Sequence, residues 1–100
     1  MTSTTGEVLL CCLLWDRPNE AAGLRAYEDR VLALIPHHGG VVVHRAQSDG
    51  ADNRPSEVQL YRFPSQSALE AYLADPNRTT HAAERDRVIA RTELFPVEFL

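Results

Sequence analysis

The residues best suited to chemistry in this chain are four histidines, ten arginines and one tryptophan. Histidine exchanges a proton near neutral pH, so His44 is the candidate general acid or base. Arg85 is the second candidate catalytic residue, because a guanidinium group binds carboxylate and similar anions. Trp15 offers a flat face on which an aromatic ring can stack.

Three further polar residues are expected to lie near these candidates. Arg45 directly follows His44, and His81 lies one helical turn before Arg85, so the latter pair shares a helix face. Glu93 follows in the last predicted strand. We predict that Trp15, Arg45, His81 and Glu93 bind a substrate, and that all six residues gather at one end of a sheet. Such a rim suits a small aromatic or acidic molecule.

Simpler structural roles remain open for the same residues. His44 and His81 could be solvated surface residues, and Trp15 could be an apolar anchor. His37 and His38 follow a predicted helix, where they would interact with its C-terminal end.

Composition excludes several functional classes. The 100 residues carry a net charge of −4 and contain no lysine. A phosphate-binding loop and a Schiff-base enzyme both need that missing amine. An acidic chain without a basic cluster also argues against nucleic-acid binding. We predict no metal and no cofactor, although a haem or metal bound through His44 or His81 stays an alternative.

The cysteines and the apolar segments indicate a cytoplasmic protein. The apolar run 8–15 is too short to cross a membrane, and no basic segment precedes it as in a secretory signal. Cys11 and Cys12 are adjacent in a predicted strand, so they point to opposite faces and do not pair with each other. Both are expected to be inert thiols.

The first half of the chain predicts a strand, a helix and a second strand. Residues 7–15 are apolar at both alternating sets of positions, which indicates a central strand. A helix follows, capped by Asp16 or Asn19 and ended by Pro36 and the glycines at 39–40. Its predicted buried stripe is Leu24, Tyr27, Val31, Leu34 and Ile35. The second strand runs over 41–45, and a long loop covers 47–56.

The second half repeats this pattern. Residues 57–63 alternate as a strand, Ser65 is the expected cap of a helix, and Asp75-Pro76 ends that helix. One or two short helices are expected within 77–90. A last strand over 92–99 contains Pro96, which belongs at a sheet edge.

The element order predicts an α+β, ferredoxin-like βαββαβ fold with sheet order 4-1-3-2. We expect one domain over residues 7–100, preceded by a disordered tail at 1–6. Both helices would cover one face of the four-stranded antiparallel sheet. Because the first strand is apolar on both faces, the other face also needs cover. The sequence therefore predicts a homodimer in which two sheets face each other.

A resemblance to a known group rests on two segments. The run from Phe63 to Pro76, preceded by His38-Gly39-Gly40 before a valine-rich strand, resembles the small dimeric α+β-barrel proteins of bacteria. The likeness is greatest to the branch of unassigned function related to antibiotic-biosynthesis monooxygenases and muconolactone isomerases. It covers residues 7–99 and implies a ligand site between sheet and helices or inside the barrel.

These observations lead to one hypothesis and two alternatives. The hypothesis is a homodimeric small-molecule-binding protein that acts as a cofactor-independent monooxygenase or isomerase of specialised metabolism. One alternative is a non-enzymatic interaction protein in which the dimer interface is the function. The other is the haem or metal binder.

Overall fold

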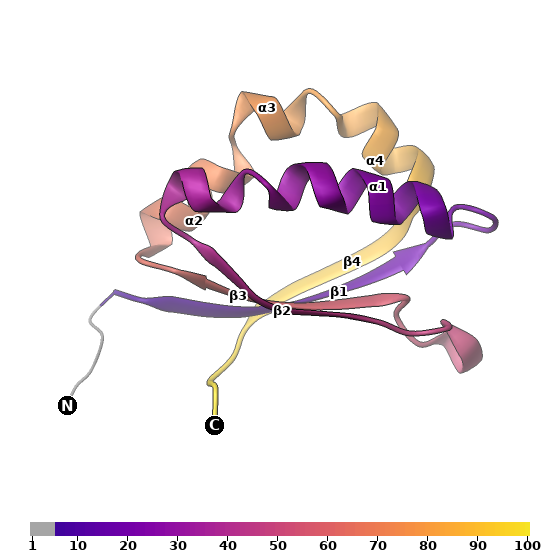
Figure 1. The fold of residues 1–100 in the computed structure, drawn as a ribbon, viewed down its shortest axis with the longest axis horizontal. Coiled ribbons are helices and arrows are strands. Elements are labelled where there is room, and N and C mark those ends of the chain that lie inside the picture. The colour runs from indigo at the N-terminus through magenta and orange to yellow at the C-terminus, as the bar shows by residue number, and fades with distance from the viewer. Residues whose placement is uncertain (1–5) are drawn as a thin grey trace.

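The computed structural model describes residues 6–100 and contains four strands and four α-helices (Figure 1). The predicted disordered tail at 1–6 lies, apart from Gly6, outside the described residues. In chain order the elements are β1 (Val8–Asp16), α1 (Ala21–Leu32), η1 (Ile35–His38), β2 (Val41–Gln47), η2 (Ala51–Asn53), β3 (Glu57–Phe63), α2 (Gln66–Leu73), α3 (Pro76–Thr79), α4 (Ala82–Val88) and β4 (Ile89–Pro96).

The strands form one antiparallel sheet in the order β2-β3-β1-β4. This is the predicted order read from the other edge, so the ferredoxin-like fold is confirmed. β1 is central, as its two apolar faces require. β4 is an edge strand, and Pro96 lies opposite Leu10 in it. A residue without a backbone N–H is tolerated there.

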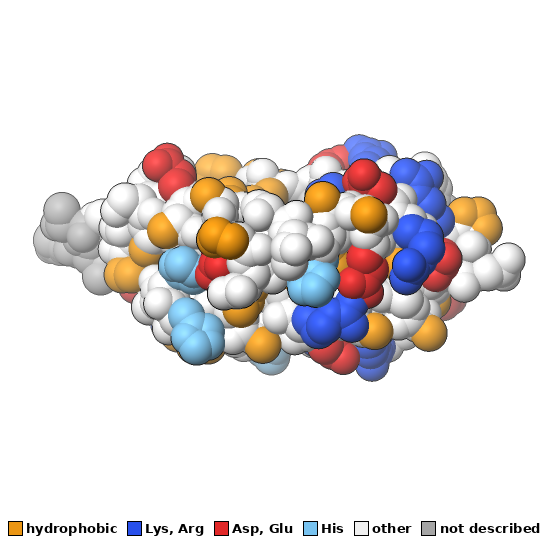
Figure 2. Space-filling view, turned by 90° about the horizontal axis from the view of Figure 1, so that it is seen from above, with side chains coloured by type: hydrophobic (Ala, Val, Ile, Leu, Met, Phe, Trp, Pro, Cys, Tyr) orange, Lys and Arg blue, Asp and Glu red, His pale blue; other side chains and the backbone are white. Residues whose placement is uncertain are grey.

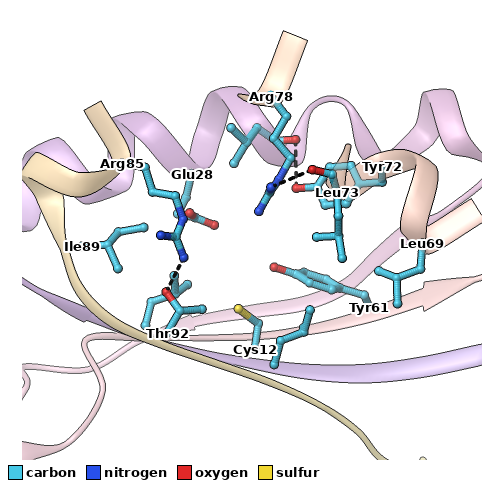
Figure 3. Close-up of a pocket in the computed structure, with 13 residues that line it drawn as sticks. Cys12, Glu28, Tyr61, Leu69, Tyr72, Leu73, Arg78, Arg85, Ile89 and Thr92 are labelled. Carbon is cyan, nitrogen blue, oxygen red and sulfur yellow. Dashed lines mark hydrogen bonds between the residues drawn. The ribbon is translucent and has the colours of Figure 1, made fainter. Parts of the chain in front are cut away.

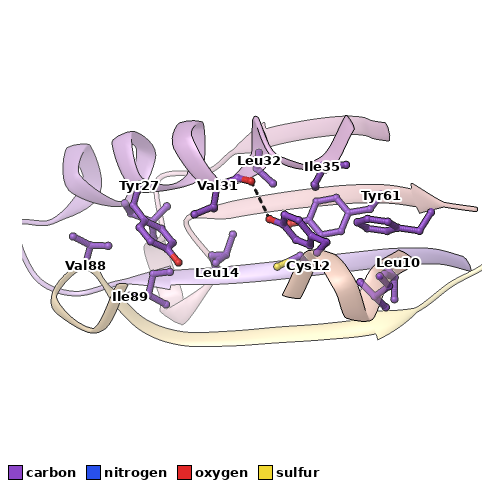
Figure 4. Packing of buried hydrophobic residues seen from close by; sticks show 14 residues of the cluster. Leu10, Cys12, Leu14, Tyr27, Val31, Leu32, Ile35, Tyr61, Val88 and Ile89 are labelled. Atoms are coloured by element: carbon purple, nitrogen blue, oxygen red, sulfur yellow. Dashed lines mark hydrogen bonds between the residues drawn. The ribbon is translucent and has the colours of Figure 1, made fainter. Parts of the chain in front are cut away.

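All four α-helices lie on one side of the sheet (Figure 1). The core between the two layers is apolar at its centre (Figure 4). Tyr72 crosses it and donates a hydrogen bond from its hydroxyl to the carbonyl of Val31 at 3.3 Å. The buried apolar side chains are Leu10, Cys12, Leu14, Leu24, Tyr27, Val31, Leu32, Ile35, Tyr61, Phe63, Leu69, Tyr72, Val88 and Ile89.

Several local signals position these elements as predicted. The Ser65 side chain accepts a hydrogen bond from the backbone N–H of Ala68 at 3.1 Å and so caps α2. Asp75 caps α3 in the same way, and Pro76 occupies its first turn. Gly39 closes η1 in the left-handed conformation, with φ of 75°.

Several predicted boundaries are wrong. α1 ends at Leu32, before the predicted end at Pro36, and β4 ends at Pro96 and not at Phe99. Neither Asp16 nor Asn19 caps α1, because Asp16 still belongs to β1, and the helix begins after Glu20 without a side-chain cap. β2 continues beyond residue 45 to Gln47. β4 begins at Ile89, three residues before the predicted start, because α4 turns directly into it.

The second face of the sheet carries no helix from residues 6–100. Side chains of β1 on this face, at Leu9, Cys11, Leu13 and Trp15, are only half-buried. Phe95 of β4 is 38% exposed. A shallow, largely apolar groove of about 530 Å³ on this face is lined by Cys11, Val43, His44, Leu60 and the C-terminal residues 97–100. We call this surface the open face.

The helices of residues 6–100 are all too short or too polar to span a lipid bilayer.

Seen from the helix side, arginine and acidic side chains are interspersed over the end of the molecule where α4 and the start of α1 lie (Figure 2).

Candidate functional site

A cavity opens between the sheet and the helix layer (Figure 3). The empty space between its side chains, including the open mouth, is about 420 Å³. The part that the centre of a water molecule can occupy is only about 40 Å³. The cavity is therefore narrow, and a ring would need side chains at its mouth to turn outward. Its lining combines apolar side chains with charged and hydrogen-bonding ones: Cys12, Leu14, Glu28, Val31, Tyr61, Leu69, Tyr72, Leu73, Arg78, Arg85, Ile89, Thr92 and Leu94.

Two guanidinium groups reach into this cavity from the short helices α3 and α4. Arg78 donates to the carbonyl of Leu73 at 3.2 Å and lies 5.1 Å from the ring centre of Tyr72. Arg85 donates to the hydroxyl of Thr92 at 3.1 Å. The Nε–H of Arg78 is buried and has no acceptor among residues 6–100. A buried donor without a partner is costly unless water or a ligand accepts from it.

A network of polar side chains lies between the sheet and α1. Gln59 of β3, fully buried, donates from its amide nitrogen to Glu28 at 2.9 Å and to Glu57 at 2.7 Å. The hydroxyl of Tyr61 donates to the carbonyl oxygen of the same amide. Arg45 of β2 pairs with Glu57. Three alternate residues of β3 therefore place polar groups on the helix-facing side of the sheet.

Burial raises the pKa of the Glu28 carboxyl, and the nearby charge of Glu57 raises it further. The hydrogen bond from Gln59 and the charges of Arg45 and Arg78 act in the opposite direction. Burial also raises the pKa of Cys12 to about 12 and holds the pKa of Tyr61 well above its usual range. Of these three side chains, Glu28 is the one whose pKa shifts toward neutral pH and not away from it.

Of the six predicted site residues, Arg85 lines the cavity. Arg45 points to the helix side but is engaged by Glu57 and by Asp29, the latter at 2.5 Å. His81 precedes α4 and lies 3.7 Å from the Glu84 carboxylate.

The other three predicted residues lie on the open face. Trp15 pairs across the sheet with Arg91, whose guanidinium lies 4.4 Å from the indole ring centre. Glu93 pairs with Leu13, and His44 pairs with Leu60. The prediction of a single rim is wrong in its geometry, because the sheet separates these side chains from Arg85 and Arg45.

A β-bulge explains the position of His44. The register of β2 on β3 shifts between Val42 and His44, so Val43 has no partner of its own. In a regular register Val43 would pair with Leu60, and His44 would lie opposite Gln59 on the helix side. One inserted residue moves every following side chain to the other face. The bulge therefore places His44 on the open face and turns Arg45 toward α1.

Sequence reasoning missed Glu28, Gln59 and Arg78. Glu28 lies four residues after Leu24 and three before Val31, so the helical spacing places it within the buried stripe. Gln59 likewise occupies an inward position of a central strand. A polar residue on a buried face is the signal that could have found both. No pattern singled out Arg78, because its approach depends on the α2–α3 corner.

No group of three or more His, Cys, Asp or Glu side chains in the described part of the chain could hold a metal ion.

Comparison with known proteins gives a fold but no family. No protein-family model and no curated protein matches the chain. Among solved structures, a protein of unknown function from Rhodopseudomonas palustris superposes with a TM-score of 0.77 at 20% identity. The match covers 95% of this chain and 83% of that one.

Two further solved structures of similar fold are named as oxygenases. A putative antibiotic biosynthesis monooxygenase from Bacteroides thetaiotaomicron has a TM-score of 0.76 at 14% identity, with 98% and 93% of the chains covered. SnoaB, a cofactor-independent oxygenase from Streptomyces nogalater, has a TM-score of 0.69 at 18% identity, with 96% and 97% covered. At such identities the likeness establishes the ferredoxin-like fold, as the resemblance implied.

Proposed function

We propose that this protein is a homodimer that binds a small organic anion in the cavity between sheet and helices. The observation that carries the proposal is the pair of guanidinium groups in a largely apolar pocket, one with a buried N–H that lacks an acceptor among residues 6–100. A carboxylate bound there would satisfy this donor. The leucines of the lining would contact an apolar or aromatic body.

The open face supports the homodimer. It presents the alternate apolar residues of the central strand, half-buried and with no helix of the described residues packed over them. A solved structure of the same fold, from Bacteroides fragilis, is described as dimeric. In such a dimer Trp15, His44 and Glu93 would face the space between the two sheets. Any part they take in binding belongs to that space and not to the cavity.

The proposed activity is that of a cofactor-independent oxygenase or an isomerase. The likeness to SnoaB supports this class through the fold alone. The cavity supports it through its chemistry, because Glu28 and Arg85 provide a carboxyl and a cation in one pocket.

A ligand-binding experiment tests the proposal. Isothermal titration would compare benzoate and phenylpyruvate with the uncharged benzyl alcohol. We expect both acids to bind more tightly than the alcohol. Replacing Arg85→Gln should weaken binding of the acids by about tenfold or more, as expected for a charged hydrogen bond. Arg54→Gln, on the exposed loop before β3, is the matched control and should change nothing.

Equal binding of acid and alcohol would contradict the anion site. A second candidate function, a dimeric interaction protein without a ligand, is favoured by the narrowness of the cavity. An intact dimer that binds none of the three probes would support that candidate.

A further inference from the structure

Glu28 stands out among the cavity residues because it is a carboxyl group with 5% exposure on the buried side of α1. One of its oxygens, Oε1, accepts the hydrogen bond from Gln59. No hydrogen bond from residues 6–100 reaches the other oxygen, and it is not among the fully enclosed atoms. The free oxygen therefore opens into the cavity, toward which the carboxyl group points (Figure 3).

Gln59 of β3 fixes the orientation of the Glu28 carboxyl group. Gln59 is held by three hydrogen bonds, two donated to Glu28 and Glu57 and one accepted from Tyr61. An amide with all these positions occupied cannot rotate without breaking them. Gln59 is thus a positioning residue that keeps one oxygen of Glu28 engaged and leaves the other free.

The charges around Glu28 favour an anion that forms beside it. Arg78 and Arg85 reach the same cavity from α3 and α4. A molecule that loses a proton to Glu28 would leave its new negative charge near these cations. The remaining titratable or charged groups on the packed elements are Cys12, Tyr27, Arg45, Glu57, Tyr61 and Tyr72.

We infer that Glu28 is a catalytic base, and that the bound anion carries an acidic C–H or O–H bond in addition to its carboxylate or similar group. This inference rests on the proposed function of the cavity. In the step, the C–H or O–H bond of the ligand breaks and its proton joins the free oxygen of Glu28. The electron pair stays on the ligand as an enolate or phenolate, which Arg78 and Arg85 stabilise. No oxidant is consumed.

Burial supports this role, because a carboxyl whose pKa is raised is a stronger base and works closer to neutral pH. The apolar lining keeps bulk water from competing for the proton.

Deuterium exchange tests the inference. Phenylpyruvate has a carboxylate, an aromatic ring and two acidic C–H bonds, and proton NMR in D₂O follows the loss of their signal. We expect the wild-type protein to accelerate this exchange above the buffer rate. Glu28→Gln keeps the shape and the acceptor for Gln59 and removes a negative charge from the cavity, so it should bind phenylpyruvate at least as tightly as the wild type. Its exchange rate should fall by about 100-fold or to the buffer rate.

Two further measurements separate catalysis from structure. The exchange rate should rise with pH at an inflection above the ordinary range of glutamate, and this inflection should vanish in Glu28→Gln. Glu70→Gln, which removes an exposed carboxylate on α2, should exchange like the wild type.

The outcomes distinguish this inference from the function on which it rests. Binding of phenylpyruvate without accelerated exchange would overturn the role of Glu28 and leave the anion site intact. The same holds if Glu28→Gln exchanges as fast as the wild type. If the wild type binds none of the acids, both proposals fall.

Discussion

Leu60→Glu is the most direct perturbation of the proposed dimer. Leu60 lies at the middle of β3 on the open face, opposite Cys11 of β1 and His44 of β2. It borders the apolar groove on that face and is only partly buried within one chain. A charge at this position would face water in the monomer but would be trapped between two sheets in a dimer.

The expected size of the effect follows from two-fold symmetry. Burying a leucine side chain contributes about 1.5–3 kcal/mol, and the symmetric interface contains this residue twice. Its loss therefore costs about 3–6 kcal/mol per dimer, before the cost of desolvating the new carboxylates. At about 1.4 kcal/mol per tenfold change, the dissociation constant should rise by about 10²- to 10⁴-fold.

Sedimentation equilibrium over a range of protein concentrations measures this constant. The wild type should be dimeric at low micromolar concentration, and Leu60→Glu should be monomeric there. Ala71→Glu adds the same charge to the exposed surface of α2 and should stay dimeric. Circular dichroism should show the same fold in all three proteins. A monomeric wild type, or a Leu60→Glu variant that dimerises normally, would refute the idea that this face is the interface.

Three further predictions concern the folded chain. Burial raises the folded-state pKa of Glu28, so ionising this carboxyl costs stability as pH rises from the ordinary glutamate range, about 4.3, toward the raised value. The stability of Glu28→Gln relative to the wild type should therefore increase over this rise in pH, as measured by urea unfolding. The hydrogen bond from His38 lowers the pKa of Asp75, so Asp75→Asn should be less stable at neutral pH, and the difference should disappear on acidification below the ordinary aspartate range near pH 4. Gly40→Ala should destabilise by about 1–3 kcal/mol in the same assay, because its new methyl group would lie 2.8 Å from the buried ring of Phe63. Unchanged unfolding curves in any variant would contradict the corresponding contact.

The fold could be predicted because its signals are local. The two apolar faces of β1 require a central strand, and Pro96 requires an edge, and these two constraints select one sheet order. The turn at 64–65 between β3 and α2 and the end of α2 before 75–76 each depend on residues adjacent in sequence. Consistent local preferences of this kind specify an architecture.

The candidate site was harder to predict because it depends on which face of the sheet each side chain points to. The bulge at Val43 reverses the side of His44 and Arg45, and the sequence Val-Val-Val does not reveal where a strand gains an extra residue. Arg78 and Arg85 reach the same cavity only because the chain bends between α3 and α4. By contrast, Glu28 and Gln59 could have been found from periodicity, since both occupy positions of a buried face.

The adjacent cysteines make the two sides of the sheet chemically distinguishable. Cys12 lies under the helices, where burial raises its pKa to about 12 and leaves little reactive thiolate while the domain is folded. Cys11 lies on the other side, next to Leu60, where its accessibility depends on what covers that surface. The number of cysteines that a thiol reagent modifies in the native protein therefore shows whether a second copy covers Cys11. The number modified after denaturation gives the total for comparison.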